Sequence, residues 1–427
     1  MNSRVWFRTL IIWTSLIVAG VFSTPFAQAQ KLILATHGVG TDNHAIEQEI
    51  ADAFAKEHGV EVDLVIFTGG EYEGKVISMI LSGNPPDVMY SAARMNGSFV
   101  GSGIVQSLNP FLERDPDFHI EDFFPAIVAG LTVDGEVYGI PRGNQPNVMF
   151  LNYTQFAEAG LPIPDRNWTW GDGFLNAARR LSRDTNRDGV ADVFGFHDGG
   201  IWWWSVVWSH GGSFLDDSES RYTLNQPAGV GALDFVASLS LEHGVAPGTR
   251  ANIGGPIPAF ANGAAAMMPS SAAGSANPMM QGLPFEWGVV EMPVGPLGRA
   301  TIVDGAGYSI AATARNPELG WALIKALTNE AGISSLTRAF TPGQVLPSRR
   351  SVALGEDFLL AGGALHDRMP FIQALEYARL PYVGKEKWPE LWGTLNRDAI
   401  QPILRGDTSA QVALDAIAPA IEAILKD

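Results

Sequence analysis

Two periodicities alternate along the chain after an apolar N-terminal run. Apolar residues recur at every second position over residues 60–67, which predicts a strand, and at every third or fourth position over residues 43–57, which predicts an amphipathic helix. Short apolar segments at residues 31–36 and 87–90 predict two more strands, and a helix is expected over residues 72–80. Strand, helix, strand, helix, strand is the order that builds a parallel sheet with helices on both faces.

Helical spacing dominates the remainder of the chain. It predicts helices over residues 172–182, 201–209, 228–243 and 316–329, and the last eighty residues are expected to be helical throughout. Residues 272–280, rich in Ala, Ser, Asn and Pro, predict a loop. We therefore expect an α/β protein, and its length of 427 residues favours two lobes or domains over one.

The N-terminal run has the features of a secretion signal. Two arginines precede a mostly apolar stretch at residues 10–22, and a small-x-small pattern ends at Ala29. Residues 1–29 are therefore predicted to be a signal peptide that is cut before Gln30. The alternative is a membrane anchor, for which the stretch is short, because a spanning helix needs about 20 apolar residues.

Composition narrows the function classes further. The sequence has no cysteine, which excludes disulfides, thiolate metal sites, thiol catalysis and a cysteine-linked lipid anchor. Its formal net charge is −17, and it becomes −19 (−17 − 2) without the two arginines of the signal peptide. So acidic a surface argues against nucleic acid and anionic lipid as partners. Twelve tryptophans supply flat apolar faces for a core or for a bound ring.

A series of short motifs follows in a fixed order along most of the chain. They are EYEGK at 71–75, SGNPPDV at 82–88, DGEVYGIP at 134–141, LNY at 151–153, FAEAGL at 156–161, WTW at 168–170, GG at 211–212, FANGAAAM at 260–267, DGAGYSI at 304–310 and LPSR at 346–349. Each motif is weak alone, but their common order is specific. In these motifs the chain resembles the maltose-binding-protein-like solute-binding proteins of carbohydrate ABC importers.

The resemblance implies an α/β, two-lobed periplasmic-binding-protein fold of the Venus-flytrap type, with discontinuous lobes and a helical C-terminus. Lobe 1 would hold residues 30–142 and 304–347, and lobe 2 residues 143–303 and 348–427. A carbohydrate or related polyol would bind between the lobes, and ABC permease subunits in the inner membrane would receive it. The resemblance further implies a periplasmic monomer without lipid anchor, cofactor or enzymatic activity.

The first group of candidate ligand-binding residues follows the ends of the predicted strands of lobe 1, where ligands of α/β sheets bind. It comprises His37, Gly38, Glu71, Tyr72 and Arg94. His37 and Gly38 precede a helix whose free N–H groups could bind a solute oxygen, or they form an ordinary capping loop. Tyr72 is a contact or a core residue. Arg94 stands where related proteins often carry an acidic and an aromatic residue, and its planar fork raises the chance of an acidic sugar.

The second group lies at the crossovers between the lobes and in lobe 2. It comprises Asn144, Gln145, Trp202, Trp203, His210, Ser270, Asp304, Tyr308 and Arg338, with Gln344 as a weaker candidate. The amides of Asn144 and Gln145 offer donors and acceptors to sugar hydroxyls, or they cap a turn. At least one of Trp202 and Trp203 is expected to stack on a sugar ring. Trp204 and Trp208 share one helix face and are expected in the core, and His210 contacts solute or supports the Gly-Gly turn.

One acidic segment imitates the beginning of a calcium loop. Its oxygen-bearing residues are Asp184, Asn186, Asp188 and Asp192, but Gly195 stands where an EF-hand needs glutamate. The segment is therefore not an EF-hand, and either a bound calcium or an Asx-rich turn remains open. No metal site is predicted beyond this weak candidate.

Two functions from other classes remain as alternatives. A secreted carbohydrate-active enzyme of the glycoside-hydrolase type would also be acidic and rich in aromatics, but it needs two carboxylates facing each other across a cleft, and no motif places two together. No phosphate-binding glycine loop, zinc-protease motif or nucleophile elbow occurs either. A chemosensory binding protein would share every feature of the transport receptor.

Overall fold

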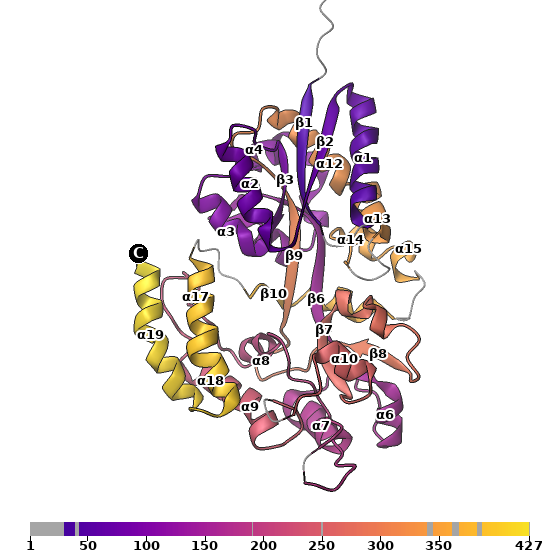
Figure 1. Ribbon diagram of the computed structural model, residues 1–427, viewed down its shortest axis with the longest axis vertical. Coiled ribbons are helices and arrows are strands. Elements are labelled where there is room, and N and C mark those ends of the chain that lie inside the picture. Colours follow the sequence, from indigo (N-terminus) through magenta and orange to yellow (C-terminus); the bar gives the residue numbers. More distant parts are fainter. Residues whose placement is uncertain are drawn as a thin grey trace, which may run out of the picture.

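Two lobes follow one another along the long axis of the molecule (Figure 1). The computed structural model describes residues 30–38, 42–189, 191–248, 251–339, 345–360, 367–381 and 387–426. The predicted signal peptide and Gln344 lie outside the described residues. Two strands, β6 (Ile140–Asn152) and β9 (Thr301–Ile310), run from one lobe into the other.

A single curved sheet carries the architecture, in the strand order β2-β1-β3-β9-β6-β7. Its lobe 1 part consists of β1 (Lys31–Gly38), β2 (Glu61–Thr68) and β3 (Val88–Ala92), all parallel. β9 is antiparallel to β3 and to β6, and β6 continues into lobe 2 beside β7 (Met267–Ser271) and β8 (Trp287–Val290). The lobes therefore share one continuous hydrogen-bonded strand pair.

Lobe 1 confirms the alternation of strands and helices that the sequence predicts. Helices pack on both faces of its sheet, so five consecutive residues of β1 are buried, as expected for a parallel strand that is covered on both faces. The helices are α1 (Asp42–His58), α2 (Tyr72–Leu81), α3 (Ala93–Gly101), α4 (Asn109–Arg114), α5 (Pro125–Gly130), α12 (Pro317–Thr328) and α13 (Glu330–Ala339), and a small hairpin joins β4 (Thr132–Val133) to β5 (Glu136–Val137).

Lobe 2 is mostly helical around β7, β8 and the lower half of β6. Its helices are α6 (Tyr153–Glu158), α7 (Asn176–Leu181), α8 (Trp203–Ser209), α9 (Pro227–Leu241), α10 (Pro256–Ala261), α16 (Met369–Ala374), α17 (Trp388–Leu395), α18 (Gln401–Arg405) and α19 (Ala410–Lys426). Two short helices, α14 (Arg350–Ala353) and α15 (Glu356–Leu359), follow the last crossover. Within the described part of the chain, no helix has the combined length and hydropathy that crossing a bilayer requires.

Three predictions for lobe 2 need correction. The helix expected over 172–182 begins as a π-helical turn, Trp170–Leu175, before α7. The loop expected over 272–280 contains α11 (Ala272–Ser275) and the 3₁₀ turn Pro278–Met280. The C-terminal region is not wholly helical, because β10 (Ala378–Arg379) pairs with β9. These elements are too short for apolar periodicity to reveal them.

A buried ion pair between Glu47 and Arg142 joins the crossover strands β6 and β9, which run between the lobes, to the rest of lobe 1. Glu47 of α1 accepts hydrogen bonds at Oε1 from Arg142 Nη1 of β6 (2.6 Å), from the Tyr308 hydroxyl of β9 (2.5 Å) and from Thr36 Oγ1 of β1 (3.0 Å). Burial alone would raise the pKa of Glu47, but the charge of Arg142 and the hydrogen bonds, including one from His44, hold the pKa below its usual value. The carboxylate therefore stays ionised and joins four elements.

Replacing Glu47 by glutamine should destabilise the protein by about 3–5 kcal/mol at pH 7, because Arg142 would stay buried without its counter-charge. Urea unfolding followed by tryptophan fluorescence measures this difference. A carboxyl with a depressed folded-state pKa contributes its stabilisation above the ordinary glutamate pKa of about 4.3. The difference between wild type and Glu47→Gln should therefore persist at pH 5 and shrink below about pH 4.

The matched control is Glu49→Gln, on the exposed side of the same helix. It should change the free energy of unfolding by less than about 0.5 kcal/mol. Equal changes in the free energy of unfolding for the two substitutions would show that Glu47 does not stabilise the crossover strands.

Candidate functional site

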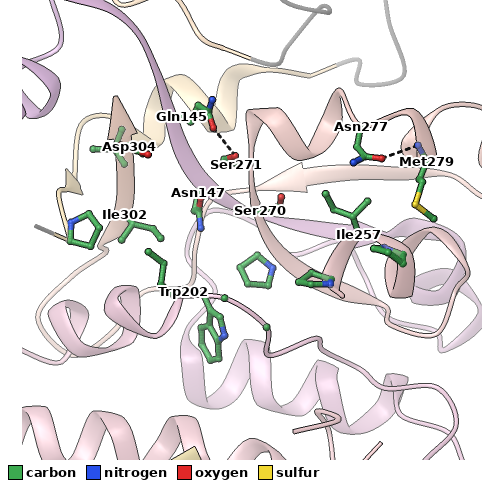
Figure 2. Close-up of a pocket in the computed structure, with 18 residues that line it drawn as sticks. Gln145, Asn147, Trp202, Ile257, Ser270, Ser271, Asn277, Met279, Ile302 and Asp304 are labelled. Carbon is green, nitrogen blue, oxygen red and sulfur yellow. Dashed lines mark hydrogen bonds between the residues drawn. The ribbon is translucent and has the colours of Figure 1, made fainter. Parts of the chain in front are cut away.

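A cavity of about 500 Å³ opens beside the crossover strands, on the side of lobe 2 (Figure 2). Segments from six parts of the chain meet there. The lining residues are Gln145, Asn147, Gly199, Gly200, Ile201, Trp202, Pro256, Ile257, Pro258, Pro269, Ser270, Ser271, Asn277, Met279, Ile302, Val303, Asp304 and Pro381. A volume in this range suits a small-molecule ligand.

Strand register brings the polar lining residues together. In the β6–β9 ladder Gln145 lies opposite Asp304, and in the β6–β7 ladder Asn147 lies opposite Ser271. Side chains two residues apart on a strand point to the same face, so Gln145 and Asn147 are both partly exposed while Val148 is buried. The Ser271 hydroxyl donates a hydrogen bond to Gln145 Oε1 (3.4 Å), as Figure 2 shows. Amides, hydroxyls and one carboxylate thus form a polar strip.

The opposite side of the cavity is apolar. It consists of the segment Gly199, Gly200, Ile201 and Trp202, which leads into α8, and of Pro256–Pro258 at the start of α10. Trp202 is 1% exposed and packs edge-on against Phe196, with ring centroids 4.7 Å apart. Its indole N–H donates to the Asp198 carbonyl (3.0 Å). Trp202 therefore closes the cavity and offers little free ring face.

Asp304 is the one ionisable side chain among the described residues that line the cavity. Burial raises its pKa above the usual range, while the charge of Arg94 and the Gly305 N–H, which donates to Oδ1 (2.8 Å), lower it in part. Arg94 lies on α3 in lobe 1, is exposed and acts on Tyr90 as well. Asp304 thus connects the cavity electrostatically to lobe 1.

Four of the residues that the sequence proposes line this cavity together: Gln145, Trp202, Ser270 and Asp304. They come from β6, from the segment before α8, from β7 and from β9, which are far apart in the chain. Arg94 approaches Asp304 without lining the cavity. These four candidates, chosen from separate parts of the sequence, therefore lie around one cavity.

The other lobe 1 candidates do not line the cavity. Tyr72 is buried and its hydroxyl donates to the Tyr90 carbonyl (2.8 Å), so it is placed as a core residue. His37 stacks on Tyr90 at 5.3 Å and meets Tyr72 edge-on. Gly38 ends β1, in close contact with Thr68, and Glu71 is exposed beside Lys75 (3.8 Å).

The remaining candidates serve the framework as well. Asn144 is buried and its amide donates to the Pro347 carbonyl (3.0 Å), which joins two crossovers. Trp203 is buried between Trp204 and Trp392, at 4.3 and 6.3 Å between ring centroids. Three other candidates also lie outside the lining. Tyr308 donates its hydroxyl hydrogen to Glu47, and the ring of His210 contacts the Val206 carbonyl. Arg338 forms an exposed ion pair with Asp357.

Several lining residues escaped the sequence interpretation. Asn147 lies two positions beyond the candidate Gln145, on the same face of β6. The glycine pair Gly199 and Gly200 and the proline-rich start of α10 had no sequence signal, because only long-range folding brings them to the cavity.

The acidic segment forms a self-contained turn. Asp184 accepts from the N–H groups of Arg187 and Gly189, and Asp192 accepts from the N–H and hydroxyl of Thr185. This is the Asx-rich arrangement that the sequence left open against calcium binding. Within the described parts of the chain, no group of three or more His, Asp or Glu side chains converges as metal ligands would.

Comparison with known proteins identifies the fold family. The model of the family described as bacterial extracellular solute-binding protein matches residues 38–333. A probable ABC transporter-binding protein of Deinococcus radiodurans is 25% identical over 286 residues, which are 65% of this chain and 67% of that protein. Among solved structures, the sugar-binding protein MalE of Xanthomonas citri is 19% identical with a TM-score of 0.78, covering 93% of this chain and 98% of its own. An ABC substrate-binding protein of Listeria monocytogenes in complex with cycloalternan is 21% identical with a TM-score of 0.76, covering 93% and 99%. The chain belongs to the bacterial extracellular solute-binding protein family.

Proposed function

We propose that this protein is a periplasmic receptor that captures a neutral carbohydrate or polyol in the cavity and delivers it to the permease subunits of an ABC importer. One observation carries the proposal: the cavity is built on β6 and β9, the strands that both lobes share. A solute held there touches the connection between the lobes. Removal of residues 1–29 during export is part of the proposal, as is a monomeric receptor without lipid anchor or cofactor.

Closure of the lobes would couple binding to delivery. We propose lobe 1 as residues 30–142 and 304–347 and lobe 2 as residues 143–303 and 348–427. A solute can drive closure only through better contacts in the closed state. Asp304 begins the second part of lobe 1, whereas Gln145, Trp202 and Ser270 belong to lobe 2, so a solute in the cavity can contact both lobes at once.

The lining favours an uncharged solute. Amides and hydroxyls can donate to and accept from sugar hydroxyls, and the apolar wall can cover the C–H face of a ring. No basic side chain occurs among the described lining residues, and the Asp304 carboxylate would repel a second anion. The acidic sugar that Arg94 suggested is therefore disfavoured, because Arg94 is not among the residues that line the cavity. The sugars in the names of the similar structures agree with this choice.

The enzyme alternative lacks its chemical requirement in this cavity. A glycoside hydrolase needs two carboxyl groups about 5–10 Å apart across the bond that breaks. Asp304 is alone among the described lining residues. The family that the chain belongs to consists of solute-binding proteins.

A panel of solutes tests the proposal on residues 30–427. A neutral saccharide such as maltose or maltotetraose at 100 times its dissociation constant should stabilise the protein by about 2.7 kcal/mol, seen as a rise in melting temperature. Glucuronic acid and glucose 6-phosphate should produce no shift. Small-angle scattering with the active saccharide should show a smaller radius of gyration.

Three outcomes would contradict it. A larger shift with the anionic compounds would overturn the neutral solute, and disappearance of the saccharide on overnight incubation would revive the enzyme. A third, no shift with any saccharide or polyol, would remove the carbohydrate assignment.

Asp304→Asn should stabilise the protein without solute and weaken saccharide binding. The pKa of Asp304 is raised in the folded state, so its charge costs stability at pH 7, and its removal should raise the melting temperature by about 1–2 °C. Below the ordinary aspartate pKa of about 3.9 the carboxyl is neutral folded and unfolded, and this gain should vanish. Saccharide affinity, measured by calorimetry, should fall about 10–100-fold, because hydrogen bonds to a charged group contribute about 1.5–3 kcal/mol.

Asp234→Asn, an exposed substitution on α9, is the matched control and should change neither quantity. If Asp304→Asn left saccharide affinity unchanged, Asp304 would not contact the solute.

A further inference from the structure

A buried histidine lies directly behind the apolar wall of the cavity. His197 is 5% exposed and precedes the lining segment that begins at Gly199. Its backbone N–H donates to the Met267 carbonyl of β7 (2.9 Å), which ties it to the sheet of lobe 2. His197 itself does not line the cavity.

Both ring nitrogens of His197 are engaged, and their partners fix its protonation. The Gly199 N–H lies 2.9 Å from Nδ1, and the Gly254 carbonyl lies 3.0 Å from Nε2. An amide N–H can only donate and a carbonyl can only accept, so Nδ1 must be the acceptor and Nε2 must carry the proton. The geometry therefore requires the neutral imidazole in a single tautomer.

The two hydrogen bonds hold two different parts of the apolar wall. Gly199 begins the segment that ends at Trp202, and Gly254 lies two residues before α10, whose first residues form the other part. The parts are in close contact, because a Cβ on Gly199 would lie 2.9 Å from Pro256 Cγ and 2.8 Å from His197 Cε1. The Trp202 indole closes the first segment onto the Asp198 carbonyl. The imidazole thus connects the two segments by hydrogen bonds.

We propose that His197 is a positioning residue for solute binding, which sets the spacing of Gly199–Trp202 against the start of α10 through its neutral Nε2–H tautomer. This inference rests on the proposed function for its binding readout. An imidazolium has no acceptor, so protonation of His197 would break the bond from the Gly199 N–H and loosen the wall. Asp198 is an ionisable neighbour of His197 among the described residues, while Gly254 and Met267 contribute only backbone atoms.

Three substitutions separate the two bonds. His197→Asn keeps an acceptor near the Nδ1 position and loses the donor to Gly254. His197→Gln keeps a donor that can reach the Gly254 carbonyl and loses the close acceptor. His197→Phe fills the space and loses both bonds. His119→Gln is the control, because His119 is an exposed histidine of lobe 1.

Amide hydrogen exchange without any sugar gives the first readout. His197→Phe should exchange at least about tenfold faster than wild type at Gly199 and at Ala259, whose N–H donates to the Gly255 carbonyl in the first turn of α10, because the open state of each segment becomes about 1.4 kcal/mol more accessible. His197→Asn should release only the α10 side, and His197→Gln only Gly199. Unchanged exchange in all three variants, or uniform loosening across lobe 2, would overturn the proposal.

Calorimetry with maltose at pH 7 gives the second readout. His197→Phe should bind maltose about tenfold more weakly than wild type, because both segments of the wall lose their bond to the ring, and His197→Asn and His197→Gln should each recover part of that loss because each keeps one bond. His119→Gln should behave like wild type. Wild-type affinity in His197→Phe, or equal losses in all three variants, would refute the role of the ring. If maltose bound to none of the proteins, the carbohydrate assignment would fail, and hydrogen exchange would still decide whether His197 holds the wall.

Discussion

The pairing of β6 with β9 is the constraint on which both the fold and the cavity depend. These strands form the middle of one sheet and extend through both lobes, so their register sets lobe 1 against lobe 2. The same register places Gln145 opposite Asp304 at the level of the cavity. A shift of one residue would turn each of these side chains to the other face of the sheet. Architecture and polar lining are therefore specified by one set of hydrogen bonds.

The Glu47 network explains how that register is held at the lobe 1 end. An isolated buried carboxylate would be costly, and a buried ion pair adds little net stability over apolar packing. Its geometry is nevertheless selective, because Arg142 from β6 and Tyr308 from β9 must both reach one oxygen of Glu47. An alternative strand alignment would leave at least one of these polar groups buried without a partner. The network therefore specifies one arrangement of β6 and β9, although it adds little net stability.

The sequence predicts those parts of the structure whose signal is local. Residues 31–90 show their periods clearly, because each strand or helix there spans at least one full repeat of its apolar pattern. The π-helical turn at Trp170 and the two residues of β10 are too short for any period. The lobes could be divided only through the resemblance to a family, since discontinuous lobes leave no trace in composition.

The residues of the candidate site also divide into those that local sequence signals reveal and those that only the folded chain reveals. Asp304 could be found because it begins the motif at 304–310, and Gln145 because it follows the motif at 134–141, where the resemblance implies a crossover between the lobes. Trp202 and Trp203 are adjacent and chemically identical, and only the packing on Trp392 decides that Trp203 belongs to the core. The glycines before α8 needed the folded chain, because their role depends on residues more than fifty positions away.

Asp304 shows how the cavity differs from the framework of the fold. In the framework, Glu47 Oε1 is buried with three hydrogen-bond donors around it. At the cavity, burial works against the charge of Asp304, and His197 is confined to one tautomer by one acceptor and one donor. Both ring nitrogens of His197 have partners, whereas the buried charge of Asp304 costs stability in the protein without solute. Local conflict of this kind is expected where selection acts on binding rather than on folding, which separates Asp304 from the polar residues of the framework.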